Sequence, residues 1–133
     1  MTVTEKLKFN KDGLMPAIVQ DAESGEILML AYMNREAFEL TVKTGKTHFY
    51  SRSRKKLWCK GETSGNVQTV AAVYTDCDYD TILVKVAQKG AACHEGYQTC
   101  FHHLLDSGAG WKIVGEKAFD PDEVYGKQSK QEK

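Results

Sequence analysis

Residues that could bind metal ions are concentrated between Asp76 and Phe101. This stretch contains three of the four cysteines of the chain, one of its four histidines and three closely spaced aspartates. Thiolate and imidazole groups suit zinc, whereas carboxylates suit magnesium or calcium. The stretch therefore combines soft and hard metal donors, and the other elements of the chain must position them.

The cysteine spacing does not match a structural zinc ribbon, because the chain lacks a Cys-x-x-Cys pair. Fifteen residues separate Cys77 from Cys93, and six separate Cys93 from Cys100. Three thiolates would leave the fourth tetrahedral position of a catalytic zinc open for water. Buried, inert cysteines are the alternative, and Cys59 or His94 could also close the site as a fourth ligand. His94 directly follows Cys93, where binding the same ion would be strained, so we expect it to act beside the metal.

Three aspartates alternate along the chain at positions 76, 78 and 80. In a straight strand, alternate side chains lie ~6.6 Å apart, which would separate Asp76 and Asp80 by ~13 Å. Magnesium ligands lie only ~2.1 Å from the ion, so a shared ion requires a sharp bend. Cys77 would face the opposite side in an extended segment. A solvated hairpin tip is the alternative, because aspartate is common in turns.

A basic, polar loop precedes the metal-donor stretch. Arg52, Arg54, Lys60 and Ser64 combine fixed charges and a hydroxyl group with neighbouring glycines. Such a loop can bind phosphate through guanidinium forks, hydroxyls and backbone N–H groups. The spacing does not match a Walker P-loop, and a solvated loop is the alternative.

The overall composition excludes two broad classes. The chain has 133 residues with 18 basic and 18 acidic side chains, so it lacks the basic excess of a typical nucleic-acid binder. No apolar run approaches the ~18 residues of a membrane span, and the N-terminus lacks the apolar core of a signal peptide. We expect one cytoplasmic domain over residues 1–133, whose cysteines bind metal or act in catalysis rather than forming disulfides.

Hydrophobic periodicity predicts an α+β fold dominated by antiparallel strands, with one or two short helices. A helix is expected over residues 35–43, with Asn34 as its N-cap, Gly45 just beyond its end, and Ala37, Phe38, Thr41 and Val42 on one face. The remaining predictions are a hairpin of strands at 14–20 and 26–32, strands at 47–51, 67–74, 81–88 and 111–114, a loop at 52–65, a hairpin tip or bend at 76–80, a short element at 101–105, a turn at 106–110, a helical turn at 121–124, and loose termini at 1–13 and 126–133.

Several of these segments together resemble the phosphoribosyl-AMP cyclohydrolase family of histidine biosynthesis. The resemblance extends over roughly residues 14–114, and Cys59 departs from the usual pattern, in which a basic residue is common there. The matching motifs are Pro16-Ala17-Ile18-Val19-Gln20-Asp21, Leu28-Met29-Leu30-Ala31-Tyr32-Met33-Asn34, Ser51-Arg52-Ser53-Arg54, Leu57-Trp58, Lys60-Gly61-Glu62, Ser64-Gly65-Asn66-Val67-Gln68, Asp76-Cys77-Asp78-x-Asp80, Gln88-x-Gly90, Ala92-Cys93-His94 and Cys100-Phe101.

The resemblance implies hydrolysis of the N1–C6 bond of the adenine ring in phosphoribosyl-AMP, which opens the purine. It implies an intertwined homodimer with active sites at the subunit interface, and a monofunctional form without the second domain that some members carry. Carried over by residue, zinc would be bound by Cys77, Cys93 and Cys100 from both subunits. Magnesium would be bound by the three aspartates at positions 76, 78 and 80.

The remaining assignments follow from the chemistry of this reaction. His94 is the candidate for proton transfer, and Arg52, Arg54, Lys60 and Ser64 are candidates for binding the substrate and its phosphates. A non-catalytic, zinc-stabilised binding module remains the alternative function. A zinc deaminase of free bases is disfavoured, because the His-x-Glu and Pro-Cys-x-x-Cys signature is missing.

Overall fold

The computed structural model describes residues 2–108 and 110–118 of the chain. No helix in this part of the chain is long and apolar enough to cross a membrane. The described elements are, in order, α1 (Thr2–Glu5), β1 (Met15–Asp21), β2 (Ile27–Met33), α2 (Arg35–Thr44), β3 (His48–Ser51), β4 (Lys56–Cys59), β5 (Gln68–Thr75), β6 (Ile82–Gln88), β7 (His103–Asp106) and β8 (Gly110–Ile113).

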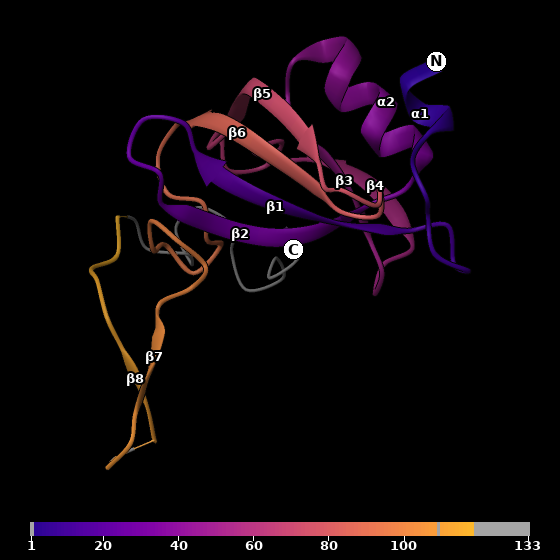
Figure 1. Cartoon of the computed structure of the whole chain (residues 1–133). Helices are drawn as coiled ribbons and strands as arrows, with labels where there is room; N and C mark the ends of the chain where they lie inside the picture. The colour runs from indigo at the N-terminus through magenta and orange to yellow at the C-terminus, as the bar shows by residue number, and fades with distance from the viewer. Residues whose placement is uncertain (1, 109, 119–133) are drawn as a thin grey trace.

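A four-stranded sheet in the order β2-β1-β6-β5 forms the centre of the molecule (Figure 1). β1 pairs antiparallel with β2 and parallel with β6, and β6 pairs antiparallel with β5. The β3–β4 and β7–β8 pairs are separate antiparallel ribbons. The predicted α+β fold with mostly antiparallel strands is therefore confirmed, and the parallel β1–β6 pair is an addition to it.

Both hairpins expected from the sequence form. The β1–β2 connection turns at Gly25, which has a φ of 80°, and the Asp21 carboxylate accepts a 2.7 Å hydrogen bond from the Ser24 N–H. The β5–β6 pairing ends with Thr75 opposite Ile82, which places the aspartate-rich segment at the tip. The tip therefore extends from the end of a well-paired part of the sheet.

Helix α2 begins and ends as predicted. The Asn34 side chain accepts a 2.8 Å hydrogen bond from the Ala37 N–H, and Gly45 is left-handed with a φ of 73°. Ala37, Phe38 and Thr41 are buried, and the two apolar residues join the sheet in the core. Val42, predicted on the same face, lies about 140° around the helix from Ala37 and is 41% exposed, at the margin of that face.

The predicted loop at 52–65 is wrong in its middle, where β4 pairs with β3. Trp58 of β4 is only 2% exposed, and its ring lies 5.0 Å from that of Phe49 between centroids. This short strand is hard to predict from the sequence, because charged residues surround it and a single large aromatic side chain accounts for its burial.

The expectation of a loose segment at 1–13 is also wrong for its described part. Thr4 of α1 is 1% exposed, and Leu7 and Phe9 pack against the core. The Lys8 N–H donates a 2.8 Å hydrogen bond to the carbonyl of Tyr79, so this segment supports the β5–β6 tip. The predicted helical turn at 121–124 and loose terminus at 126–133 lie outside the described residues.

The β7–β8 ribbon extends away from the sheet (Figure 1). Its strands match the predictions at 101–105 and 111–114 to within two residues. Leu104, Leu105, Trp111 and Ile113 are each more than half exposed. An isolated two-stranded ribbon is marginally stable in water, so these apolar side chains suit contact with another surface.

Gly61, in the connection from β4 to β5, provides a test of how tightly that connection is packed. Its φ is +88°, and an added Cβ would lie 2.6 Å from the backbone nitrogen of Val67, whereas Gly65 has a φ of +79° and open space. Alanine at either position incurs left-handed strain of ~1–2 kcal/mol, but only Gly61→Ala also overpacks, at a further ~1–3 kcal/mol. Urea unfolding should show Gly61→Ala to be the less stable variant, and equal losses would contradict this packing.

Candidate metal and catalytic site

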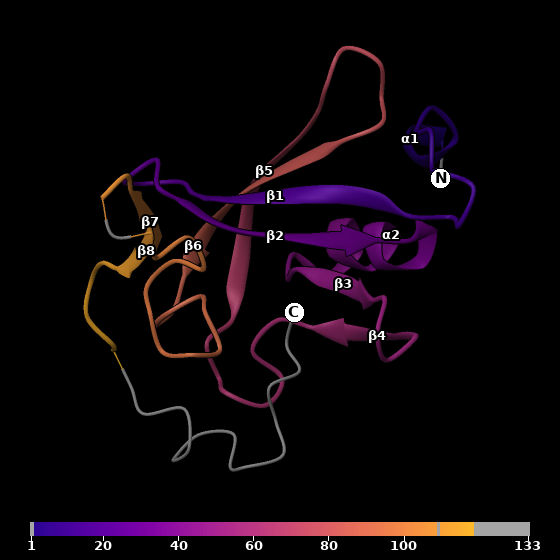
Figure 2. The same cartoon turned by 90° about the horizontal axis from the view of Figure 1, so that it is seen from below.

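The candidate metal donors gather in two groups near the opposite ends of β6. The ligand atoms within each group all lie within 4.8 Å of one another. Figure 2 shows the β5–β6 tip at one end of the sheet and the segment after β6 at the other, as does Figure 1. β6 has seven residues and so spans roughly 20 Å, at about 3.3 Å per residue. The first group is Asp76, Asp78 and Asp80, and the second is Cys93, Glu95 and His102.

The β5–β6 tip bends sharply enough to bring its three aspartates together. Tyr79 is left-handed with a φ of 62°, and its N–H donates to the carbonyl of Asp76 at 3.2 Å. The Asp76 carboxylate accepts a 3.0 Å hydrogen bond from the Asp80 N–H. The ~13 Å separation of a straight strand therefore does not apply, and one ion could reach all three carboxylates.

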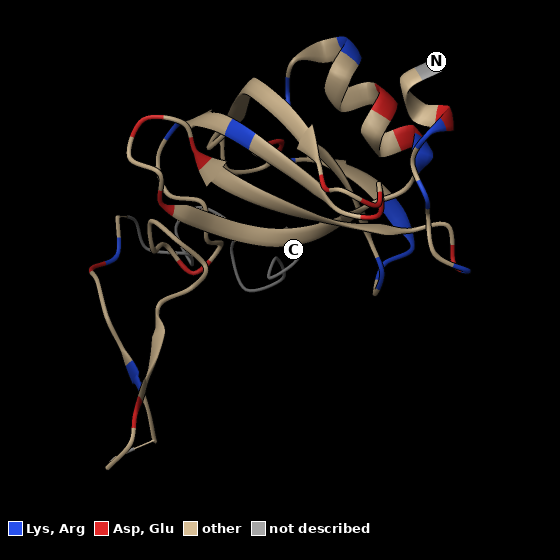
Figure 3. Ribbon diagram, viewed as in Figure 1, with Lys and Arg blue, Asp and Glu red and all other residues tan. Residues whose placement is uncertain are grey.

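The ribbon of the β5–β6 tip is red at its acidic residues in Figure 3, and the three aspartate side chains there are exposed and repel one another. The side chains of Asp78 and Asp76 raise the pKa of the Asp80 carboxyl above its usual value. Desolvation opposes ionisation of Asp76, but hydrogen bonds led by the Asp80 N–H still lower the pKa of its carboxyl. A divalent cation would relieve this crowding, and exposure suits Mg²⁺, which retains several waters.

Backbone hydrogen bonds, rather than regular secondary structure, fix the Cys93–Cys100 segment. The Cys93 N–H donates to the carbonyl of Tyr97 at 3.1 Å, and the Ala92 N–H to that of Gln98 at 3.1 Å. The Cys100 N–H donates to the carbonyl of Leu28 in β2 at 2.7 Å. The two cysteines are thereby joined to the edge of the central sheet.

The surroundings of Cys93 favour the thiolate form of its side chain. It is 4% exposed, and a hydrogen bond from the Cys100 side chain lowers the pKa of its thiol to about 6, against the opposing effect of desolvation. The Glu95 N–H, 3.4 Å from the Cys93 sulfur, acts in the same direction. Because metal ions bind the thiolate, this environment favours metal binding at neutral pH.

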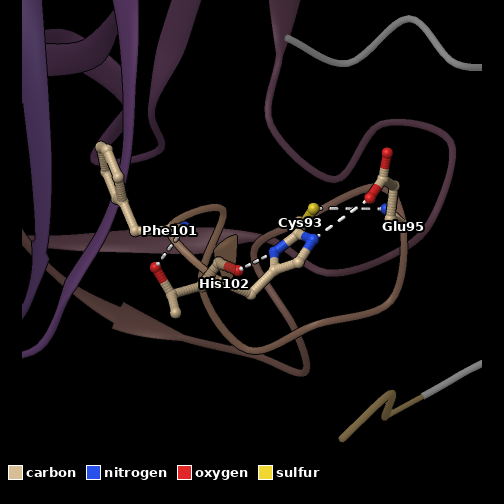
Figure 4. A network of polar contacts seen from close by, with 5 residues as sticks. Cys93, Glu95, Phe101 and His102 are labelled. Atoms are coloured by element: carbon tan, nitrogen blue, oxygen red, sulfur yellow. Dashed lines mark hydrogen bonds and ion pairs between the residues drawn. The ribbon is translucent and has the colours of Figure 1, made fainter. Parts of the chain in front are cut away.

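His102 and Glu95 lie close to Cys93 and add two candidate metal ligands to the cysteine pair (Figure 4). The His102 side chain is 4% exposed, and its Nε2 lies 3.2 Å from Glu95 Oε1. Its Nδ1 lies 3.0 Å from the Thr99 carbonyl, which can only accept, so Nδ1 carries a proton. Sequence analysis missed both residues, although a histidine two residues after Cys100 was an available signal.

His94, from the same segment, lines a cavity of about 800 Å³. The cavity also contains Arg52, whose guanidinium carbon lies 4.0 Å from the centre of the Tyr32 ring. Its other lining residues are Leu30, Ala31, Tyr50, Ser53 and Phe101. Two of the sequence-predicted site residues, His94 and Arg52, are thus brought together at a wall of apolar and aromatic side chains.

The other predicted phosphate contacts have different hydrogen-bond partners in the structure. Lys60 is 1% exposed, and its ammonium donates a hydrogen bond to the carbonyl of Ala92, next to Cys93. The Arg54 N–H donates to Ser51 Oγ at 3.2 Å, and Ser64 Oγ accepts from the Asn66 N–H at 3.1 Å. Lys60 therefore supports the cysteine segment, while the Arg54 and Ser64 backbones belong to local turns.

Cys77, Cys100 and Cys59 belong to neither group of metal donors in the described residues, although the Cys100 side chain contacts Cys93. Cys77 is exposed at the β5–β6 tip, whereas Cys59 is half-buried at the end of β4. The donor chemistry fits zinc at Cys93 and Cys100 and magnesium at the three aspartates, since zinc prefers thiolate and imidazole and magnesium prefers carboxylate.

The fold and the donor set define an α+β protein with a group of candidate metal ligands around the Cys93 thiol, next in the chain to His94 at a cavity. A sequence model of the phosphoribosyl-AMP cyclohydrolase family matches residues 29–102. Proteins named phosphoribosyl-AMP cyclohydrolase from Pelotomaculum thermopropionicum and Chlorobium limicola are 63% and 53% identical to this chain, over 93% and 94% of its length and 96% and 91% of theirs. The relative of the same name from Methanoregula boonei is 54% identical over 91% of this chain and 95% of its own. The chain belongs to the phosphoribosyl-AMP cyclohydrolase family, as the sequence motifs predict.

The Cys93–Cys100 contact makes a testable prediction for the metal-free protein. In a background with Cys59 and Cys77 changed to alanine, ultraviolet thiolate absorbance should rise near pH 6, as Cys93 ionises. Cys100→Ala removes the hydrogen-bond donor and should move this step to higher pH. Cys93→Ala should abolish the step and so assign it, while a step unaffected by Cys100→Ala would contradict the contact.

Proposed function

We propose that this chain hydrolyses the N1–C6 bond of the adenine ring of phosphoribosyl-AMP, the ring-opening step of histidine biosynthesis. The observation that carries the proposal is identity above 50% to proteins of that name over more than nine-tenths of the chain. The cavity lined by His94 and Arg52 supports it, because His94 directly follows Cys93 in the chain. The free thiols suit a reducing compartment, so we propose the cytoplasm as its location.

The proposed zinc site combines residues of two subunits in a homodimer. Cys93 and Cys100 are in contact, whereas Cys77 is exposed near the other end of β6. A second copy of this chain could bring its own Cys77 tip to the Cys93–Cys100 pair. The exposed apolar side chains of the β7–β8 ribbon provide a surface that such an intertwined dimer would bury.

The proposed magnesium site is the aspartate cluster at the same tip. Asp76, Asp78 and Asp80 converge without burial, as expected for an ion that retains waters and also binds substrate phosphate. If the tip of one subunit reaches the cysteine pair of the other, both metal sites come to the same substrate. One phosphate would then lie at the aspartates, and Arg52, Arg54 and Ser64 are proposed to bind the other end of the molecule.

The residues around the cavity suit this chemistry. Cys93 and Cys100 would hold zinc, which would supply an activated water with a pKa of about 7 for attack on adenine C6. His94 is proposed to move a proton between that water and the departing N1. The aromatic rings of Tyr32, Tyr50 and Phe101 offer flat apolar surfaces for the base, and Arg52 offers a guanidinium for phosphate. Lys60 is proposed to hold the Cys93 segment in place through Ala92, instead of contacting phosphate.

A non-catalytic, zinc-stabilised binding module is the alternative, and the names of the relatives do not favour it. The two functions differ in what a chelator does. An enzyme with an exchangeable catalytic zinc should lose turnover before it unfolds, whereas a structural module should unfold as its metal leaves.

The direct test is turnover of phosphoribosyl-AMP by the purified protein, with metal analysis of the same sample. His94→Asn should lower kcat by roughly 10²–10⁴-fold while the zinc content stays unchanged, because only a proton carrier is lost. His103→Asn is the matched control, since His103 is exposed on β7 and should leave kcat unchanged. Wild-type protein without turnover would reject the proposed function, and near-normal kcat in His94→Asn would reject only the role of that residue.

The shared site predicts complementation between two inactive variants. Cys77→Ser and Cys93→Ser should each abolish turnover alone. In a mixed dimer, one site receives Cys77 from one subunit and Cys93 with Cys100 from the other, so random pairing should restore about a quarter of wild-type activity. No recovery after co-refolding would contradict a zinc site shared between subunits. Cys59→Ser should stay active and serves as the control for loss of a cysteine.

A further inference from the structure

We propose that His102 is a metal ligand within a single subunit. Together with Cys93 and Cys100, it would form a three-ligand site that retains zinc without Cys77. This inference rests on the proposed function only in assuming zinc at the two cysteines. It assigns a role to a buried histidine that the sequence motifs do not include.

The orientation of His102 is the first observation. The Nδ1–H donates to the Thr99 carbonyl at 3.0 Å, and the ring stacks on Tyr97 with 3.9 Å between centroids. Metal-binding histidines typically donate their second ring nitrogen in this way, which fixes the tautomer and turns the other nitrogen toward the ion. Here Nε2 is turned toward Cys93 and Glu95.

The second observation is the contact between Nε2 and Glu95. These atoms lie 3.2 Å apart. In a neutral imidazole protonated at Nδ1, the lone pair of Nε2 would face the carboxylate oxygen and repel it. A metal ion placed between the two atoms would accept the lone pairs of both and make this contact favourable. The His102 side chain is 4% exposed and the Glu95 side chain is 51% exposed, so the ring nitrogen is shielded from water while the carboxylate is not.

Distances in the cluster fit zinc. With Zn–S near 2.3 Å and Zn–N near 2.0 Å, the ligand atoms of a tetrahedral site lie about 3.5 Å apart. The atoms of Cys93, Glu95 and His102 all lie within 4.8 Å of one another, and Cys100 contacts Cys93 through its side chain. Cys100 lies outside that group of atoms, so its thiol would have to turn toward His102 Nε2 to complete a Cys₂His site, a ligand set known for catalytic zinc.

The consequence is an order of assembly. Cys77 lies near the opposite end of β6 from this cluster, so a subunit that needed it could not retain zinc alone. With His102 as a ligand, each subunit binds its metal first. The Cys77 tip of the second copy then binds a zinc that is already in place and takes the position of His102, which leaves the fourth position open for the water that turnover requires.

Zinc content per subunit in a double-mutant comparison tests this proposal. Cys77→Ser and His102→Asn should each retain about one zinc per subunit after gel filtration, because each leaves three ligands. The double variant should lose zinc, with affinity at least about 100-fold below that of Cys77→Ser in chelator competition, more than the 10–100-fold expected from loss of an orienting group. His103→Asn and His94→Asn in the Cys77→Ser background are the matched controls and should retain zinc.

Three results would overturn the proposal: Cys77→Ser purified without zinc, a double variant that retains zinc as well as Cys77→Ser does, or loss of zinc with His94→Asn in place of His102→Asn. If the double variant does not fold, X-ray absorption of zinc-loaded Cys77→Ser decides instead. It should show two sulfur ligands and an imidazole, and absence of the imidazole would overturn the proposal. Wild-type turnover is measured separately, so its failure would reject the proposed function without affecting this result.

Discussion

The inner position of β6 is the constraint on which the candidate site depends. β6 is paired on both sides, parallel to β1 and antiparallel to β5, and its residues Ile82, Val84 and Val86 are buried in the core. A fully paired strand of this kind is rigid, so the two segments that it joins cannot approach each other. The aspartate tip and the Cys93 segment are therefore held apart within one subunit. A site that needs donors from both can form only between copies of the chain.

The segment that carries Cys93 and Cys100 has little secondary structure of its own, and its geometry is imposed by neighbours. Lys60 provides the least expected support, because a buried ammonium is costly unless its protons are hydrogen-bonded. Its bond to the Ala92 carbonyl offsets part of that cost and fixes the backbone next to Cys93. Lys60 follows β4, which is itself anchored by Trp58. The geometry of the thiolate thus depends on packing that lies about 35 residues upstream in the chain.

Much of the fold could be predicted from the sequence where local patterns decide the structure. Asn34 and Gly45 limit α2 because capping is a local interaction, and the paired strands β5 and β6 follow from alternating branched residues. The failures involve contacts that are remote in sequence. The burial of Lys60 depends on Ala92, and the importance of His102 depends on Thr99 and Glu95 being folded against it. No local pattern reports such contacts, so a basic loop residue was predicted to bind phosphate and a buried histidine was overlooked.

The two groups of donors differ in their surroundings as well as in their chemistry, and the surroundings explain why one chain can distinguish two metals. The aspartates converge through a left-handed turn at Tyr79 and remain exposed, so an ion there can retain water molecules and exchange them for phosphate oxygens. Cys93 is buried, and its low pKa supplies a thiolate that a hard ion would bind poorly. Cys77 lies between Asp76 and Asp78 in the sequence but outside their cluster. The same tip can therefore deliver a soft donor to a partner while it holds a hard ion itself.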